Sequence, residues 1–285
     1  MNDNFQKLSI YKLFNKSKKY SIKWSSYFQV YEKIFSHYRN KKIKFVEIGV
    51  ANGGSLFMWK KYFGKKAKII GIDLNPKAKK LEKNGFKIYI GNQSDKKFWE
   101  NFYKKEGKVD LILDDGGHKN LQQISTVHHS LPYIKDGGKI VVEDTGTSYV
   151  KKEFNNPSKY SFINYAKNVI DAIHRRSPLL KKELNFYSKK IFLVEFFESI
   201  VVFSIDSKKC FKNKEVHNEA QNEWAIDYRH NEYFGKLKLK LDKKYGLLNK
   251  RSFYRRIIRK IFYKNLIFNF LDKIKIKKIF RELDN

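Results

Sequence analysis

The chain has 285 residues, of which 41% are hydrophobic and 16% aromatic, and its net charge is +32. This length and composition can fill the core of one large α/β domain with additions, while the positive charge favours anionic partners such as phosphates, nucleic acid or an acidic membrane surface. Cys210 is the single cysteine, and we find neither a signal-peptide pattern nor an apolar run that could span a bilayer, so we expect a cytoplasmic protein without an internal disulfide.

Residues 1–43 are predicted to form a helical N-terminal addition. An apolar stripe at helical spacing is formed by Tyr27, Tyr31, Ile34 and Phe35. Stripes of this kind usually pack on a protein core. The alternative is that Lys23, Tyr27 or Tyr31 covers a cofactor pocket.

The most informative stretch is residues 44–55, where an apolar strand containing Glu47 leads into a glycine-rich turn and then a helical pattern. Strand, tight loop and helix in this order form the first unit of a doubly wound α/β sheet, which binds its ligand beyond the carboxyl ends of the strands. Gly49 and Gly53 let the loop turn sharply and approach a ligand closely. A second strand ends at Asp73, where an acid can bind the two hydroxyls of a ribose. The alternative is an ordinary turn followed by a solvated aspartate.

Strands and helices alternate through residues 44–206, which we predict to be the main domain. Strands are predicted at 45–48, 69–72, 87–90, 109–113 and 139–142, with helices near 55–63, 76–84, 95–105 and 119–134. This alternation is typical of a mainly parallel sheet covered on both faces. A further helix is predicted near 160–175, and the apolar runs 191–197 and 200–205 predict an antiparallel hairpin that completes a seven-stranded sheet.

Residues 207–285 are predicted to be a basic, helical C-terminal extension. Between residues 251 and 285, apolar and basic side chains recur at near-helical spacing. A basic amphipathic helix can lie in an anionic membrane interface, which would place the protein at the inner membrane face. The alternative is that this stripe packs on the main domain or on a second subunit of a homo-oligomer.

Acidic groups follow two further strands. Asp114, Asp115 and His118 come after one strand, and Glu143 and Asp144 come after the next. Because the carboxyl ends of parallel strands share one edge of a sheet, we expect these side chains to converge, although each acid taken singly is also a typical helix N-cap. Crowded carboxylates require a compensating cation, and Mg²⁺ or Mn²⁺ suits oxygen ligands. Histidine ordinarily titrates near pH 6.5, so His118 is a candidate general base.

Five motifs resemble the metal-dependent sugar O-methyltransferases, a group that includes the mycinamicin 2-O-methyltransferase type and relatives near the macrocin O-methyltransferase and cephalosporin-hydroxylase-like families. The motifs occupy residues 47–55, 71–75, 91–95, 114–118 and 143–144. The resemblance covers about residues 20–206 and implies a class I methyltransferase fold, Rossmann-like, that uses S-adenosyl-L-methionine. It further implies a magnesium ion held by Asp115, Glu143 and Asp144, with His118 as the catalytic base.

The resemblance also implies the cofactor contacts. They are Glu47, Gly49 and Ser55 near the methionine end, Gly53 in the same loop, Asp73 on the ribose, Gln93 or Asp95 near the adenine, and Asp114. The chain departs from the family in having Gly117 where the usual Asp-Asp-Gly-Ser-His motif has serine. This change removes no metal ligand.

The implied activity is methyl transfer to a sugar hydroxyl. We expect a phosphate-linked acceptor, such as a nucleotide sugar or a lipid-linked glycan of a bacterial surface-polysaccharide pathway. The alternatives are a nucleic-acid or other small-molecule methyltransferase, a hydroxylase-like relative, and a non-catalytic binding module. A metal and histidine site for a sugar does not require nucleic acid as a partner, and a hydroxylase would need the two-histidine-one-carboxylate pattern, which is not evident in the sequence.

Overall fold

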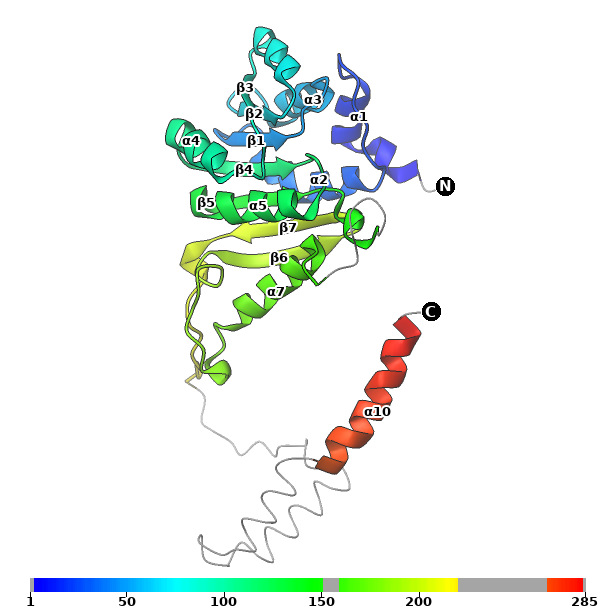
Figure 1. Cartoon of the computed structure of the whole chain (residues 1–285), viewed down its shortest axis with the longest axis vertical. Helices are drawn as coiled ribbons and strands as arrows, with labels where there is room; N and C mark the ends of the chain where they lie inside the picture. Colours follow the sequence, from blue (N-terminus) through cyan, green and yellow to red (C-terminus); the bar gives the residue numbers. More distant parts are fainter. Residues whose placement is uncertain (1–2, 151–158, 220–265, 284–285) are drawn as a thin grey trace, which may run out of the picture. The chain divides into compact units, whose positions relative to one another are not determined.

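The computed structural model of the chain describes residues 3–150, 159–219 and 266–283 (Figure 1). The chain divides into two compact units, Met1–Val216 and His217–Asn285. In the second unit the described element is helix α10 (Leu266–Leu283), and residues 251–265 of the predicted amphipathic stripe lie outside the described residues. None of the described helices combines the length and the apolarity needed to cross a membrane.

The first unit is built on one seven-stranded sheet with the strand order β3-β2-β1-β4-β5-β7-β6. Its strands are β1 (Lys44–Ile48), β2 (Lys68–Asp73), β3 (Lys87–Ile90), β4 (Val109–Asp114), β5 (Ile134–Val142), β6 (Ile191–Phe197) and β7 (Ile200–Ile205). Strands β1 to β5 pair in parallel, whereas β7 runs antiparallel to both β5 and β6. The predicted doubly wound sheet with an antiparallel final hairpin is therefore confirmed.

Helices cover both faces of this sheet (Figure 1). The α-helices are α1 (Ser9–Asn15), α2 (Tyr27–Phe35), α3 (Gly54–Phe63), α4 (Lys96–Glu106), α5 (Asn120–Ser130) and α7 (Phe162–His174). Shorter 3-10 helices are η1 (Asp3–Lys7), η2 (Ser36–Tyr38), η3 (Pro76–Asn84), η4 (Leu131–Tyr133), η5 (Thr145–Tyr149), η6 (Pro178–Leu180) and η7 (Ser207–Lys209). Along β1, Phe45 packs in the core shared with α1, α2 and α3, and Val46 in the core shared with α4, α5 and α7. Burial on both faces explains why the strands are apolar without a polar face.

Residues 76–84 form the predicted helix, and it is a 3-10 helix. The buried side chains of this element are Ala78 and Leu81. A spacing of three residues aligns on one face of a 3-10 helix, which has three residues per turn. The tighter helix therefore buries both side chains against the domain.

Helix α5 also ends earlier than predicted. The helix ends at Ser130 and not near residue 134, because Pro132 cannot continue a helix interior and lies in η4. Strand β5 then begins at Ile134, several residues before the predicted start, and its register with β4 shifts between Val109 and Leu111.

The N-terminal helix α2 packs on the sheet through its predicted stripe. Tyr27, Tyr31, Ile34 and Phe35 are each at most 3% exposed. The rings of Tyr31 and Phe35 contact Trp59 of α3, with ring centroids 5.1 and 5.4 Å apart. The packing interpretation of this stripe is confirmed.

Gly49 lies where the loop after β1 comes closest to the end of β4. Its φ of +83° is a left-handed backbone conformation. A Cβ atom at this position would overlap the carbonyl group of Asp115. Both the backbone angle and the available space therefore require glycine here.

We expect Gly49→Ala to destabilise the domain more than the matched control Gly137→Ala. Gly137 has nearly the same φ, +82°, but an added Cβ would meet nothing within 4 Å. The control should lose about 1–2 kcal/mol for a left-handed alanine, and Gly49→Ala should lose more because the Asp115 backbone must also move. Urea unfolding followed by circular dichroism measures both losses, and equal losses would contradict the close-approach argument.

Candidate active site

A cavity of about 830 Å³ lies at the carboxyl edge of the parallel strands. Four residues that the sequence placed in the site line it, one at or after the end of each of β1, β2, β3 and β4: Gly49, Asp73, Gln93 and Asp115. The shared edge of parallel strands brings them together, as expected. Lys19, Lys77 and Lys80 also line the cavity and give it a basic wall.

Asp73 holds the backbone of the loop after β1. Its Oδ2 accepts hydrogen bonds from the N–H groups of Val50 (2.9 Å) and Ala51 (3.0 Å), and its Oδ1 accepts one from the N–H of Asn75 (2.8 Å). Hydrogen bonds to a charged carboxylate are stronger than neutral ones. Asp73 therefore shapes the loop and lines the cavity at the same time.

Glu47 is buried beneath this loop and does not line the cavity. Its carboxylate accepts hydrogen bonds from Ser55 Oγ (2.8 Å) and Trp59 Nε1 (3.1 Å). Burial raises the pKa of Glu47 to about 7. Gly53 precedes α3 with a φ of +83°, and like Ser55 it supports the loop from outside the cavity lining.

Gln93 connects the cavity to the end of β4. Its Nε2 donates to both carboxylate oxygens of Asp114 at 2.9 Å, and its Oε1 accepts from the N–H of Gly117 at 3.3 Å. Asp114 is buried, and burial raises its pKa. Asp95, by contrast, caps α4 by accepting from the N–H of Lys97, and it does not line the cavity.

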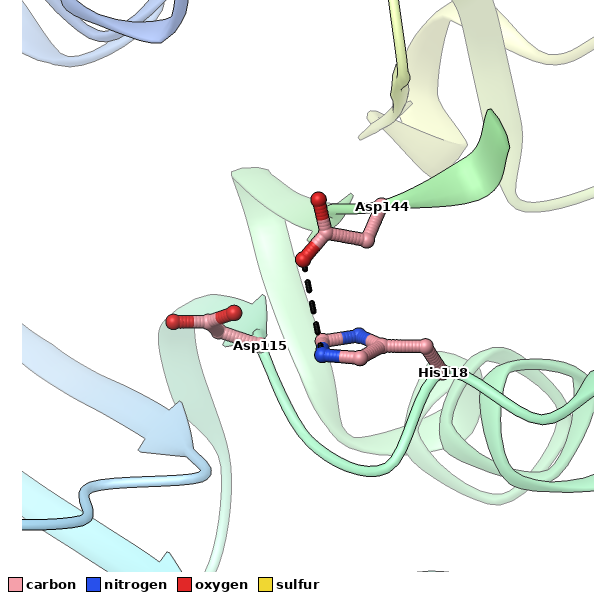
Figure 2. Close-up of side chains that lie close together, drawn as sticks. All are labelled: Asp115, His118 and Asp144. Carbon is pink, nitrogen blue, oxygen red and sulfur yellow. Dashed lines mark ion pairs between the residues drawn. The ribbon is translucent and has the colours of Figure 1, made fainter. Parts of the chain in front are cut away.

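Asp115, His118 and Asp144 lie close together beside the cavity, with one donor atom from each within 4.8 Å of the others, and His118 and Asp144 face each other (Figure 2). His118 Nε2 lies 3.4 Å from Asp144 Oδ2. Both of these residues have a left-handed backbone, with φ of +56° and +53°. The Thr147 hydroxyl lies 2.9 and 2.8 Å from the carbonyl oxygens of His118 and Asp144, so it links the backbones of these two left-handed residues. Backbone strain of this kind concentrates at functional sites.

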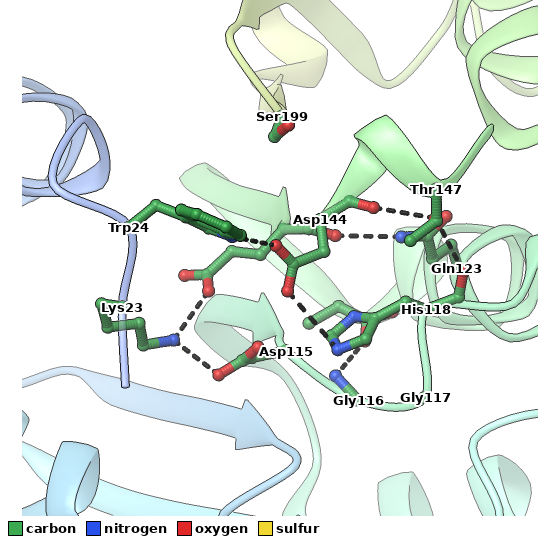
Figure 3. A network of polar contacts seen from close by, with 12 residues as sticks. Lys23, Trp24, Asp115, Gly116, Gly117, His118, Gln123, Asp144, Thr147 and Ser199 are labelled. Carbon is green, nitrogen blue, oxygen red and sulfur yellow. Dashed lines mark hydrogen bonds and ion pairs between the residues drawn. The ribbon is translucent and has the colours of Figure 1, made fainter. Parts of the chain in front are cut away.

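Glu143 lies next to this cluster and is fully buried. Its Oε1 accepts a hydrogen bond from the Tyr31 hydroxyl, and its Oε2 is 2.7 Å from Lys23 Nζ. The same Lys23 nitrogen is 2.6 Å from Asp115 Oδ2 (Figure 3). Burial raises the pKa of Glu143 to about 8, although Lys23 acts in the opposite direction. Burial alone would lower the pKa of Lys23, but the two carboxylates outweigh it and hold that pKa above the usual range.

The N-terminal addition also contacts Asp144. Its Oδ1 accepts hydrogen bonds from Trp24 Nε1 (3.1 Å) and the Tyr27 hydroxyl (2.7 Å). Lys23, Tyr27 and Tyr31 thus reach the acidic groups and do not line the cavity, so they do not cover it as the alternative interpretation proposed. Trp24 was not predicted as a site residue, because a single exposed tryptophan before a helix has no periodic signal in the sequence.

Gln122 occupies the space beside Gly117. Position 117 is the one at which the family that this chain resembles has serine. A Cβ at Gly117 would overlap the Gln122 side-chain amide. Gln122 Oε1 in turn accepts a hydrogen bond from the N–H of Lys119 at 3.1 Å. Glycine at 117 and glutamine at 122 therefore fit each other at the start of α5.

The donor chemistry of this edge fits a divalent cation. The carboxylates of Asp115, Glu143 and Asp144 lie together, and the single ammonium of Lys23 faces two of them, which leaves an excess of negative charge. Oxygen donors with such an excess suit Mg²⁺ or Mn²⁺. Within the described part of the chain, the candidate metal group has one histidine and two carboxylates, which does not match a two-histidine oxygen-activating centre.

Residues 46–145 match a family model described as a methyltransferase domain. This part of the chain is therefore similar to methyltransferase domains. This match spans the loop after β1, the Asp73 strand end and the clusters at 114–118 and 143–144. The matched residues therefore include most of the elements that form the cavity and the acidic edge.

The methyltransferase domain is similar to sugar O-methyltransferases. It is 30% identical over 166 residues to the 8-demethyl-8-alpha-L-rhamnosyl tetracenomycin-C 2'-O-methyltransferase of Streptomyces olivaceus, a match that covers 54% of this chain and 43% of that protein. It is 32% identical over 126 residues to the mycinamicin VI 2''-O-methyltransferase of Micromonospora griseorubida, which covers 42% of this chain and 31% of that protein. The chain spans less than half the length of these relatives.

A solved structure supports the same resemblance. The MycE methyltransferase from the mycinamycin biosynthetic pathway, in complex with Mg and SAH, aligns with a TM-score of 0.57 at 25% sequence identity. The alignment covers 62% of this chain and 48% of that chain. The predicted class I methyltransferase fold and its resemblance to the sugar O-methyltransferases are confirmed.

We expect Glu47 to make the methyltransferase domain less stable as the pH rises. A carboxyl whose folded pKa is raised contributes stability fully below its ordinary pKa of 4.5, and this contribution is lost as the pH rises through about 7. The slope in this window should be about 1.4 kcal/mol per pH unit. Urea unfolding of wild type and Glu47→Gln at several pH values isolates the effect in their difference. A difference that does not vary with pH would contradict the assignment.

Proposed function

We propose that this protein transfers a methyl group from S-adenosylmethionine to a hydroxyl of a sugar. The observation that carries the proposal is the cluster of Asp115, His118 and Asp144 directly beside the cavity at the carboxyl edge of the sheet. The relatives support it, because the proteins to which the domain is similar are named as sugar O-methyltransferases.

The cavity would hold S-adenosylmethionine. We assign Asp73 to the ribose and Gln93 to the adenine. Asp114, which is hydrogen-bonded to Gln93, and Asp95, at the start of α4, would support the adenine side. The methionine end would lie against the loop that Glu47, Gly49, Gly53 and Ser55 form and support. The assignments that the cavity lining supports directly are Gly49, Asp73 and Gln93.

Asp115, Glu143 and Asp144 would hold a magnesium or manganese ion. When bound, this ion lowers the pKa of a coordinated sugar hydroxyl and stabilises the negative charge that develops on its oxygen. The negative excess at the three carboxylates supports this assignment. MycE, a structural neighbour, was crystallised with Mg and SAH.

His118 would act as the general base. A ring nitrogen accepts the proton of the sugar hydroxyl, and Asp144, 3.4 Å from His118 Nε2, stabilises the imidazolium that results. The sugar oxygen forms a bond to the methyl carbon as the bond from this carbon to sulfur breaks. The products are a methyl ether, S-adenosylhomocysteine and a proton on His118. The residues contribute alignment and charge stabilisation.

We propose a phosphate-linked sugar as the acceptor, in the cytoplasm of a bacterium and in surface-polysaccharide synthesis. The net charge of +32 supports an anionic acceptor. The relatives are named for sugars attached to antibiotics, so a glycosylated macrolide is the competing acceptor.

A methyl-transfer assay with labelled S-adenosylmethionine tests the function. The acceptors are nucleotide sugars, lipid-linked glycans, a glycosylated macrolide and RNA, each with and without EDTA. We expect labelled methyl ether from a sugar acceptor and its loss on chelation. Labelled RNA would identify a nucleic-acid methyltransferase, and full activity in EDTA would contradict the metal.

We expect Asp73→Ala to weaken the binding of S-adenosylmethionine. Losing a charged hydrogen-bond acceptor should cost about 1.5–3 kcal/mol of binding free energy. Isothermal titration calorimetry measures the change. Asp136→Ala is the control, since Asp136 also accepts from a backbone N–H and a hydroxyl, both of Ser207, but does not line the cavity. Unchanged affinity in Asp73→Ala would contradict the ribose assignment.

We expect His118→Ala to lower turnover by about 10²–10⁴-fold, which is typical for loss of a general base. Asp115→Ala should lower both turnover and metal affinity, because it removes a charged ligand. Calorimetry with Mn²⁺ separates these roles. If His118→Ala also abolishes ion binding, then His118 is a ligand and the base lies elsewhere.

We expect residues 251–285 to bind an anionic membrane or to mediate assembly, and one deletion separates these outcomes. In α10 the side chains of Ile274, Ile276, Ile279 and Phe280 are 51–63% exposed. Membrane binding predicts that the full chain co-sediments with anionic vesicles, that high salt releases it, and that removal of 251–285 abolishes binding. Assembly predicts no vesicle binding and a change in oligomeric state, measured by light scattering. A deletion that changes neither property would contradict both.

A further inference from the structure

The segment between α1 and α2, residues 16–26, lies over the start of α3, and we call it the strap. Ser17 Oγ donates a hydrogen bond to the carbonyl oxygen of Gly54 at 2.7 Å. A Cβ on Gly54 would come within 2.5 Å of the carbonyl oxygens of Lys19 and Tyr20. Because Lys19 also lines the cavity, the strap forms part of the cavity wall.

Polar contacts with the acidic groups hold the end of the strap, whereas its apolar side chains are largely in solvent. Tyr20, Ile22 and Trp24 are 71%, 72% and 67% exposed. The side chain of Lys23, in contrast, is only 2% exposed. Apolar burial therefore contributes little to the position of these residues. The ion pairs of Lys23, together with the hydrogen bond from Trp24 to Asp144, hold them in place (Figure 3).

The ammonium of Lys23 lies between two of the proposed metal ligands. Its Nζ is 2.6 Å from Asp115 Oδ2 and 2.7 Å from Glu143 Oε2. A divalent ion bound by the same two carboxylates would face this ammonium as a like charge in a buried place, where charges are poorly screened. The two cations therefore compete for these carboxylates. The divalent ion has twice the charge and better matches the excess of negative charge.

We propose that Lys23 is a resident counter-ion of the metal site, which a divalent ion displaces, so that metal binding frees the Lys23 end of the strap. This inference rests on the metal site of the proposed function. In the metal-free protein Lys23 keeps Asp115 and Glu143 compensated and in place. Metal binding then couples to the cavity through a segment of the chain that contacts both.

The first test is ion affinity in the full-length protein. Lys23→Ala removes the competing cation, so Mn²⁺ measured by calorimetry should bind about tenfold tighter or more, because the ion no longer has to break a buried ion pair. Lys33→Ala is the matched control. Lys33 is also on the N-terminal addition and pairs with Glu195 at 3.2 Å, away from the acidic edge, so its removal should leave the affinity unchanged. Equal or weaker ion binding by Lys23→Ala would show that Lys23 supports the ligands and would overturn displacement.

The second test needs no variant of Lys23. Wild-type protein is labelled with acetic anhydride with and without saturating Mg²⁺, and mass spectrometry measures acetylation at each lysine. Lys23 should be protected without the ion and reactive with it, while Lys33, whose side chain is 61% exposed, should react in both states. If the ion binds and Lys23 stays protected, displacement is wrong and the metal site stands. If calorimetry detects no ion binding in wild type or Lys23→Ala, both displacement and the metal part of the proposed function fail.

Discussion

Buried carboxyl groups near the carboxyl edge of the sheet constrain the rest of the site. Glu47, Asp114 and Glu143 are at most 1% exposed, and each is at or directly after the end of a parallel strand. A buried carboxylate without partners is strongly unfavourable. Each of the three accordingly has donors: Ser55 and Trp59 for Glu47, Gln93 for Asp114, and Lys23 with Tyr31 for Glu143. Of these donors, Gln93 also lines the cavity, whereas the others come from the N-terminal addition and from α3.

The N-terminal addition has two roles in this arrangement. Its helix α2 packs aromatic rings against α3 and the sheet, and the same residues present polar atoms to the acids. Tyr31 is fully buried among aromatic rings, yet its hydroxyl reaches Glu143. A tyrosine can do both because its ring is apolar and its hydroxyl requires a hydrogen-bond partner when buried. Packing and charge compensation therefore depend on each other here.

A close backbone contact couples the cavity to the acidic cluster. Gly49 leaves no room for a side chain against the carbonyl group of Asp115. The loop that would bind the methyl donor and the residue proposed to bind the metal thus touch without an intervening side chain. For a methyl transfer this short separation matters, because donor and acceptor must be aligned at close range.

The sequence by itself determined the sheet, its final hairpin and the set of acids at one edge. These follow from local patterns, since apolar runs, glycine-rich turns and the shared edge of parallel strands are all readable along the chain. It also predicted the buried stripe of α2 from its spacing. The 3-10 form of η3 and the early end of α5 were not predicted, because a few buried side chains and one proline outweighed the helical pattern.

Only the tertiary structure decided which groups compensate the acids. Lys23 is 92 residues before Asp115 and 120 before Glu143, and nothing in the local sequence of a lysine-rich chain distinguishes it from other lysines. The structure likewise separated residues that line the cavity, such as Asp73 and Gln93, from Glu47 and Asp95, which support loops or cap helices. Such roles depend on the direction of each side chain in the folded domain. That direction is set by packing between distant segments, which no local pattern records.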